Sequence, residues 1–220
     1  MNYKVLKRVI GVKNKEIDAI IFDLDGTLWN TIDSCLKATN FVKNEHSDIT
    51  RDVTREQIES AMGKTSDEIV NIYYGYLPRE KGEEYANETF YKNVDNLLKE
   101  GGTLYPNTKE TIIKLSKKYK LYIVSNCVKG YIESFLNTSG LKDYFDDYES
   151  YGNTLLSKGE NIKLVIERNN LKSPIYVGDT SGDMEGAKIA DIPFVYAAYG
   201  FGKVESFDYK INDIRELLDL

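Results

Sequence analysis

Short apolar runs alternate with amphipathic segments along the second half of the chain. An apolar run that ends at Asp23 predicts a first buried strand, and similar runs predict strands at 120–126, 173–179 and 192–198. Between these runs, apolar residues recur at the spacing of helices, at 111–119, 129–140, 157–170 and 181–191. Strands that alternate with helices form a parallel sheet covered on both faces. The pattern therefore predicts a three-layer α/β/α fold.

The stretch 32–102 has a different pattern, in which only helices are predicted. Two helical segments begin with the capping-box spacing Thr-x-x-Gln or Thr-x-x-Glu, at 54–62 and 65–77. A longer helical segment follows at 83–102, where it ends in Gly101-Gly102. Because the block follows the first strand, it leaves the sheet at the carboxyl end of that strand, where open α/β sheets bind ligands. We expect a helical insert that acts as a lid.

Composition and charge predict a cytoplasmic protein. The chain has 220 residues and a net charge of −6, which disfavours nucleic acid or an anionic membrane as a partner. It has no apolar run of about eighteen residues for a membrane span, and its start lacks the features of a signal peptide. Cys35 and Cys127 lie far apart, which fits a reducing compartment. We expect a monomer or a weak homodimer, in which residues 1–17 could add an edge strand.

Polar side chains gather where the predicted strands end. They are Asp23 and Asp25, then Ser125 and Asn126, then Asp179, with Asp183 one helical turn later. In a parallel sheet these ends converge on one crevice. Carboxylates so close repel one another, and a hard divalent cation such as Mg²⁺ relieves that repulsion. Because Mg²⁺ commonly shares a substrate phosphate, we expect a small phosphate ester as the substrate.

The same residues resemble a known set of motifs. In order and spacing, "DLDGT" (23–27), "SN" (125–126), Lys158 and "GDTSGD" (178–183) resemble the four motifs of the haloacid dehalogenase superfamily. The block 32–102 resembles the helical cap of its phosphoglycolate-phosphatase-like and β-phosphoglucomutase-like branch. The resemblance covers nearly the whole chain from about residue 18. It implies a Rossmann-like catalytic core from 1–31 and 103–220, with an inserted helical cap at 32–102.

The resemblance also implies a role for each matching residue. Asp23 would be the nucleophile that forms an aspartyl-phosphate, and Asp25 the general acid and then the general base. Asp23, the backbone carbonyl of Asp25 and Asp179 would hold Mg²⁺, with Asp183 close to them. The phosphoryl group would be bound by Thr27, Ser125, Asn126 and Lys158. In the cap, Lys64 would contact the substrate. The predicted activity is hydrolysis of a small-molecule phosphate monoester.

Other interpretations stay open for several of these residues. Lys158 could be a surface lysine, since Ser157 and Glu160 form a capping box that explains the stretch without catalysis. The single histidine, His46, lies in a polar stretch, where we expect it to be exposed, and no histidine triad or zinc site is available.

Two other activities also stay open. A sugar phosphomutase of the same superfamily is one, although the first cap helix lacks the histidine of such enzymes. A phosphoryl-binding regulatory protein without turnover is the other.

Overall fold

Six parallel strands form the central sheet of the protein. A computed structural model describes residues 17–220, so the suggested edge strand within 1–17 lies almost entirely outside the described residues. The strands run in the order β5-β4-β1-β6-β7-β8, and all neighbours are parallel. Their bounds are β1 Ala19–Phe22, β4 Lys120–Ser125, β5 Asp147–Ser150, β6 Pro174–Gly178, β7 Phe194–Ala197 and β8 Tyr209–Ile211. The first strand is therefore central, between β4 and β6.

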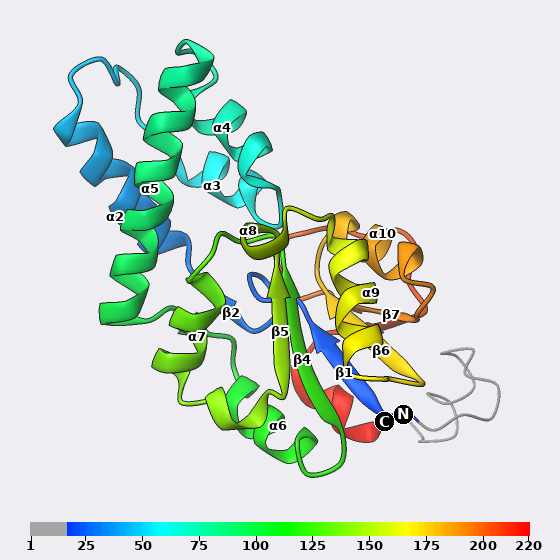
Figure 1. Ribbon diagram of the computed structural model, residues 1–220. Helices are drawn as coiled ribbons and strands as arrows, with labels where there is room; N and C mark the ends of the chain where they lie inside the picture. Colours follow the sequence, from blue (N-terminus) through cyan, green and yellow to red (C-terminus); the bar gives the residue numbers. More distant parts are fainter. Residues whose placement is uncertain (1–16) are drawn as a thin grey trace.

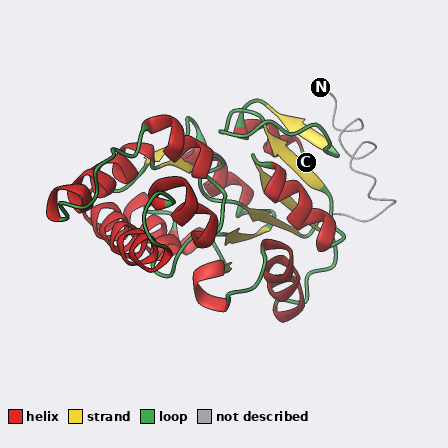
Figure 2. Ribbon diagram, turned by 90° about the horizontal axis from the view of Figure 1, so that it is seen from above, coloured by secondary structure: helices red, strands yellow, loops and turns green. Residues whose placement is uncertain are grey.

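Helices cover both faces of this sheet (Figures 1 and 2). One face packs on α6 (Thr108–Leu115), α7 (Tyr131–Ser139) and the 3₁₀ helix η2 (Ile214–Asp219). The other packs on α9 (Lys158–Arg168) and α10 (Ser181–Ile189). Alternate strand residues supply the two faces, because successive side chains of a strand point to opposite sides. This confirms the predicted three-layer α/β/α fold.

Residues 32–100 form a group of helices with an apolar core of its own. The helices are α2 (Ile32–Glu45), α3 (Arg55–Ala61), α4 (Ser66–Tyr74) and α5 (Arg79–Glu100). We call them the cap helices. In Figure 1 they lie beyond the carboxyl ends of the strands. The capping boxes predicted at Thr54 and Thr65 are both present. Where the chain leaves and re-enters the core, β2 (Trp29–Asn30) pairs antiparallel with β3 (Thr103–Leu104).

Several elements differ from the sequence prediction. Helix α6 begins three residues earlier than predicted and ends at Leu115, and α5 begins at Arg79. The edge strands β5 and β8 and the short strands β2 and β3 were not predicted, nor were three short helices, η1 (Lys142–Tyr144), α8 (Tyr151–Thr154) and η2. The polar sequence of β5 lacks the apolar run that marked the central strands. Within residues 17–220, no helix has the length and apolar character needed to cross a membrane.

Candidate active site

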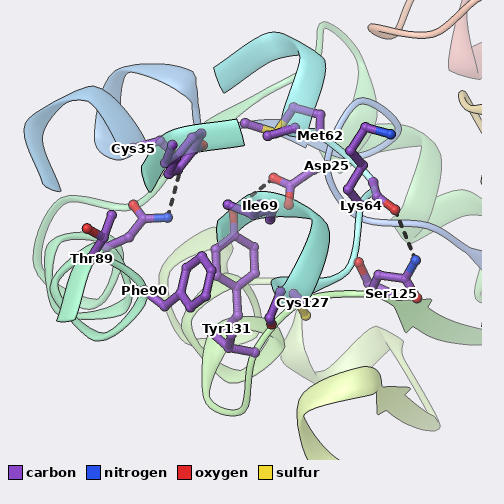
Figure 3. A pocket seen from close by; sticks show the side chains of 17 residues that line it. Asp25, Cys35, Met62, Lys64, Ile69, Thr89, Phe90, Ser125, Cys127 and Tyr131 are labelled. Atoms are coloured by element: carbon purple, nitrogen blue, oxygen red, sulfur yellow. Dashed lines mark hydrogen bonds between the residues drawn. The ribbon is translucent and has the colours of Figure 1, made fainter. Parts of the chain in front are cut away.

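The carboxyl ends of β1 and β4 meet the cap helices at a cavity (Figure 3). The cavity encloses about 700 Å³, including the part that is open to solvent. Asp25, Ser125 and Asn126 line it from the core side. Side chains from all four cap helices line the opposite side. The sheet topology explains this placement, because parallel neighbours bring the loops after their strands to one edge.

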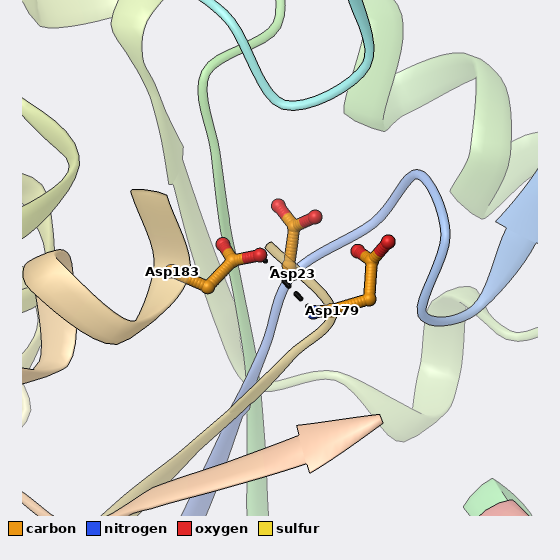
Figure 4. A group of neighbouring side chains, drawn as sticks. All are labelled: Asp23, Asp179 and Asp183. Carbon is orange, nitrogen blue, oxygen red and sulfur yellow. Dashed lines mark hydrogen bonds between the residues drawn. The ribbon is translucent and has the colours of Figure 1, made fainter. Parts of the chain in front are cut away.

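Three buried carboxylates, which do not themselves line this cavity, lie together near the carboxyl ends of β1 and β6 (Figure 4). Asp23 follows β1, Asp179 follows β6, and Asp183 lies in the first turn of α10. Each offers one carboxylate oxygen, and these oxygens all lie within 4.8 Å of one another. The backbone N–H of Asp23 donates to Val177 O at 2.8 Å, which fixes the end of β1 against β6. The predicted convergence of these acids is therefore present in the structure.

Lys158 supplies the positive charge inside this cluster. Its Nζ lies 2.9 Å from Asp23 Oδ1 and 2.5 Å from Asp183 Oδ1, and the side chain is buried. Burial alone would lower the pKa of Lys158, but Asp183 and Asp23 raise it well above its ordinary value. The capping box at Ser157 and Glu160 is also present, and it begins α9 so that Lys158 points inward. The surface-lysine interpretation is therefore wrong.

Asp183 uses both of its oxygens within the protein. Oδ1 accepts from Lys158 and, at 3.3 Å, from the Tyr176 hydroxyl. Oδ2 accepts from the backbone N–H groups of Asp179 at 3.1 Å and Thr180 at 2.8 Å, and from the Thr180 hydroxyl at 2.7 Å. This carboxylate orients Lys158 and the turn between β6 and α10. A cation bound to Asp183 would have to compete with these donors.

Asp179 is enclosed by two backbone loops. Its Oδ2 accepts from the N–H of Phe201 at 2.7 Å, and Thr27 donates its hydroxyl to Oδ1 at 3.4 Å. Gly26 has a φ of +85°, and a Cβ added there would lie 2.3 Å from Asp179 Oδ2. Only glycine fits this close approach in the left-handed region. Thr27, predicted to bind phosphate, thus lies buried against Asp179.

One oxygen of Asp23 is left without a partner. Asp23 Oδ2 is buried and accepts no hydrogen bond from any side chain or backbone group of residues 17–220. Burial and the nearby Asp183 raise the pKa of the Asp23 carboxyl, and Lys158 opposes them. Burial, Asp183 and Asp23 raise the pKa of Asp179. The cluster therefore holds more negative charge than Lys158 compensates, and its all-oxygen donor set fits a hard divalent cation such as Mg²⁺.

Asp25 has a separate environment from Asp23. Its Oδ1 accepts from the Thr31 hydroxyl at 2.8 Å and lies 2.9 Å from the Tyr131 hydroxyl. Burial raises the pKa of Asp25 to about 6, although these hydrogen bonds partly oppose the shift. Leu24, between the two acids, is fully buried in the core. Tyr131 was missed in the sequence, where a tyrosine at the start of a helix carries no signal of its own.

Asn126 connects the core to the cap helices. Its Nδ2 donates to Gly63 O at 2.9 Å, while its Oδ1 is buried without a partner among the described residues. Gly63 lies in the loop between α3 and α4, with a φ of +75°, and a Cβ there would lie 3.1 Å from Thr180 Cγ2. The same loop carries Lys64. We call residues 62–65 the cap loop.

Side chains of the cap helices and the cap loop differ in their access to the cavity. Lys64 lines it, and its Nζ lies 3.6 Å from Glu68 in a half-exposed ion pair. Tyr73 also lines it, whereas Tyr74 is buried and bonds to the Thr89 hydroxyl at 2.8 Å. His46 is half-buried, 2.6 Å from Glu88, so the expectation of an exposed side chain is wrong. Its partner Glu88 lies on α5, so the polar sequence around His46 did not predict this contact.

Comparisons with known proteins agree with this geometry. Residues 20–197 match the sequence model of the family "Haloacid dehalogenase-like hydrolase". The phosphoglycolate phosphatase of Aliivibrio fischeri is 24% identical over 212 residues, which cover 91% of this chain and 92% of that protein. A solved haloacid dehalogenase-like hydrolase from Streptococcus pneumoniae is 22% identical, with a TM-score of 0.80, and covers 92% of this chain and 97% of its own. CbbY from Rhodobacter sphaeroides, solved with xylulose-(1,5)bisphosphate, is 16% identical, with a TM-score of 0.75, and covers 92% and 96%.

Proposed function

Because the chain belongs to the haloacid dehalogenase-like hydrolases, we propose that it is a Mg²⁺-dependent phosphatase of small-molecule phosphate monoesters. Asp23 would form an aspartyl-phosphate, and Asp25 would transfer the protons. One observation carries the proposal: Asp23 Oδ2 is buried and unpartnered, beside the buried cation Lys158. An orphaned carboxylate oxygen is costly unless a ligand completes it. A divalent cation that also binds the oxygens of a phosphoryl group would do so.

The first half-reaction transfers the phosphoryl group to Asp23. A carboxylate oxygen of Asp23 attacks phosphorus, and the bond between phosphorus and the substrate's ester oxygen breaks. That oxygen takes the proton of Asp25 and leaves as an alcohol. A pKa of about 6 at Asp25 keeps a useful fraction of the acid protonated near neutral pH. The hydroxyls of Thr31 and Tyr131 hold the carboxyl group of Asp25 in place through its Oδ1.

The second half-reaction releases phosphate. Asp25, now ionised, accepts a proton from water as the water oxygen attacks phosphorus. The bond from phosphorus to Asp23 breaks, which restores the carboxylate and frees inorganic phosphate. Lys158 keeps its charge through both steps, because the acids around it hold its pKa high. It therefore neutralises charge and transfers no proton.

The chain's own residues suit a bound Mg²⁺. Asp23, Asp179 and the backbone carbonyl of Asp25 would hold it, while Asp183 would act mainly through its hydrogen bonds. The cation would neutralise the negative charge of the carboxylates and of the phosphoryl group. Phosphoryl transfer depends on such alignment and neutralisation more than on elaborate side-chain chemistry.

The remaining predicted residues would bind and enclose the substrate. We assign Ser125 and Asn126 to the phosphoryl group from the core side, with Thr27 holding Asp179 in place. The cap helices, 32–102 in the predicted division, would close over the substrate and exclude water. Lys64 would lie at the edge of the cavity. We propose a cytoplasmic protein with no nucleic-acid or membrane partner, a monomer or weak homodimer, in keeping with its net charge of −6.

The test is phosphate release from a panel of small monoesters with Mg²⁺ or with chelator. Wild type should turn over at least one ester, and chelator should abolish the activity. Asp23→Asn removes the nucleophile and should lower kcat by at least about 10³-fold. Asp95→Asn, the same change at an exposed position on α5, is the matched control and should retain wild-type kcat.

Three results would contradict the proposal. Full activity in Asp23→Asn would remove the nucleophile assignment. Transfer of phosphate between two sugar phosphates, without release, would favour the phosphomutase instead. A long-lived phosphorylated Asp23 without turnover would favour a regulatory protein.

A further inference from the structure

Apart from Asp25, Ser125 and Asn126, the wall of the cavity is mostly apolar. It is formed by side chains of the cap helices, of the cap loop and of the loop after β4, among them Cys35, Met62, Ile69, Phe90, Cys127 and Val128. Figure 3 shows Ile69 and Phe90 beside Tyr131, on the side of the cavity that Asp25 faces. Asp25 is the acid that would protonate the leaving oxygen. The rest of the leaving group must therefore lie against this apolar wall.

The wall offers little positive charge. Among the described residues that line the cavity, Lys64 is the single cationic side chain, and Glu68 already pairs with it at the half-exposed edge. The two thiols add no negative charge, since burial raises the pKa of Cys35 to about 12 and that of Cys127 well above its usual value. Asp25 is the acidic residue of the lining. A second anionic group on the substrate would meet a carboxylate and an apolar surface.

Two polar side chains of the wall, Asn93 and Thr89, have their hydrogen-bond partners within the cap helices. Asn93 donates from Nδ2 to Cys35 Sγ at 3.2 Å, and its Oδ1 accepts from the Ser34 hydroxyl at 2.6 Å. The Thr89 hydroxyl donates to Tyr85 O at 2.8 Å. These groups do not need a polar ligand to complete them. Burying a carboxylate or a phosphate here would remove it from water without a counter-ion.

We infer that the leaving group of the preferred substrate is an uncharged alcohol or phenol with an apolar skeleton. This inference rests on the proposed phosphatase activity and names the substrate class of the same site. It disfavours substrates with a carboxylate beside the phosphate, and bisphosphates, whose second anionic group would lie in the cap half of the cavity. The reactive phosphoryl group would still be recognised by the core residues.

The test compares esters that differ only in charge. Wild-type kcat/KM is measured on para-methylphenyl phosphate against para-carboxyphenyl phosphate, and on ethyl phosphate against phosphoglycolate. The uncharged member of each pair should be preferred by at least about tenfold. The carboxylated phenol is the better leaving group, so intrinsic reactivity works against the expected result. Preference for the carboxylated members would overturn the inference.

A variant tests whether the wall sets this preference. Ile69→Lys places a cation in the wall and should raise the ratio of carboxylated to uncharged activity by at least about tenfold. Ile69→Gln, of similar length but uncharged, is the matched control and should not raise it. A folded Ile69→Lys with an unchanged ratio would overturn the inference. If that variant does not fold, the wild-type ratios decide alone.

Lys64→Met adds an independent readout. In this variant, kcat/KM for the carboxylated ester and for its uncharged counterpart should change by the same factor. Selective loss of the carboxylated ester would show that Lys64 supplies a counter-ion, and would overturn the inference. Failure of the proposed function looks different, because no ester would then show turnover that depends on Asp23.

Discussion

Asp23 and Asp25 lie one residue apart but have different partners. Asp23 Oδ1 pairs with Lys158, and Asp25 Oδ1 bonds to Thr31 and Tyr131. Leu24 between them is anchored in the core, so both carboxylates project to the same edge of the sheet. Separate environments allow two acids of one type to take different roles, one ionised as nucleophile and the other protonated as acid.

Tyr131→Phe tests whether Tyr131 positions Asp25. The hydroxyl favours the ionised form of Asp25, so its loss should raise the pKa of Asp25 above about 6. Because the proposed first step needs protonated Asp25, the basic limb of kcat/KM against pH should move to higher pH. Loss of orientation should also lower kcat by roughly tenfold. The measurement is a pH profile of wild type and variant.

Tyr91→Phe is the matched control for this change, since Tyr91 is 70% exposed on α5. Its profile should superpose on that of wild type. A Tyr131→Phe profile that also superposes would show that the tyrosine does not act through Asp25. The carboxylates were predictable because strand ends converge, but this tyrosine reaches Asp25 from 106 residues away, which no local pattern records.

At the level of elements, local sequence signals located the central parts of the fold. Strands β1, β4, β6 and β7 were predicted because apolar runs mark strands buried on both faces. Strand β5 was missed because it carries acidic residues, Asp147 and Glu149. Arg168 on α9 pairs with them at 2.6 Å and 2.7 Å. The strand β5 thus depends on an ion-pair partner, Arg168, that lies outside its own stretch of sequence, so its local pattern did not predict a strand.

The cap loop is the element that joins the cap helices to the site. Gly63→Ala tests its fit, because φ at this residue is +75° and a Cβ would press on Thr180. A left-handed backbone at a residue other than glycine costs about 1–2 kcal/mol. We expect lower stability by about that amount and a higher KM, since the loop carrying Lys64 should shift from the core. Chemical denaturation and steady-state kinetics measure the two effects.

Gly182→Ala on α10 provides the comparison. A Cβ there would meet its nearest atom, Thr180 Oγ1, at an unstrained 3.6 Å. Stability should be unchanged or slightly higher, because alanine favours the helix. An equal loss of stability in both variants would show that the left-handed conformation of Gly63 is not the cause.

Across the whole molecule, the buried carboxylates of the candidate site oppose folding when they are ionised and no cation is bound. The carboxyl pKa values of Asp23, Asp25 and Asp179 are all raised by burial. The folded state then binds more protons than the unfolded state, so stability falls as pH rises. For Asp25 the contribution is fully present below its ordinary value of 3.8 and is lost as pH rises through about 6. The other two acids raise stability further when protonated.

The protein in chelator should therefore melt at higher temperature at pH 5.5 than at pH 7.5. Saturating Mg²⁺ at pH 7.5 should raise Tm by several degrees, because a ligand that binds the folded state stabilises it. Asp23→Asn should reduce both effects, since it removes one of the repelling charges. Differential scanning calorimetry measures all three. A wild-type Tm in chelator that does not change, or falls, between pH 7.5 and pH 5.5 would contradict the assigned pKa shifts.

The short ribbon of β2 and β3 has a consequence for how this chain could be rebuilt. Trp29 lies opposite Leu104 and Asn30 opposite Thr103, so the two ends of the intervening helices are already neighbours. If the cap helices were removed, a tight turn from β2 to β3 would join the two parts of the core without moving either strand. Helices of another size or sequence could likewise be grafted at the same two joints. If the cap helices select the substrate as proposed, such a graft would change the substrate while the proposed catalytic carboxylates keep their places at the ends of the strands.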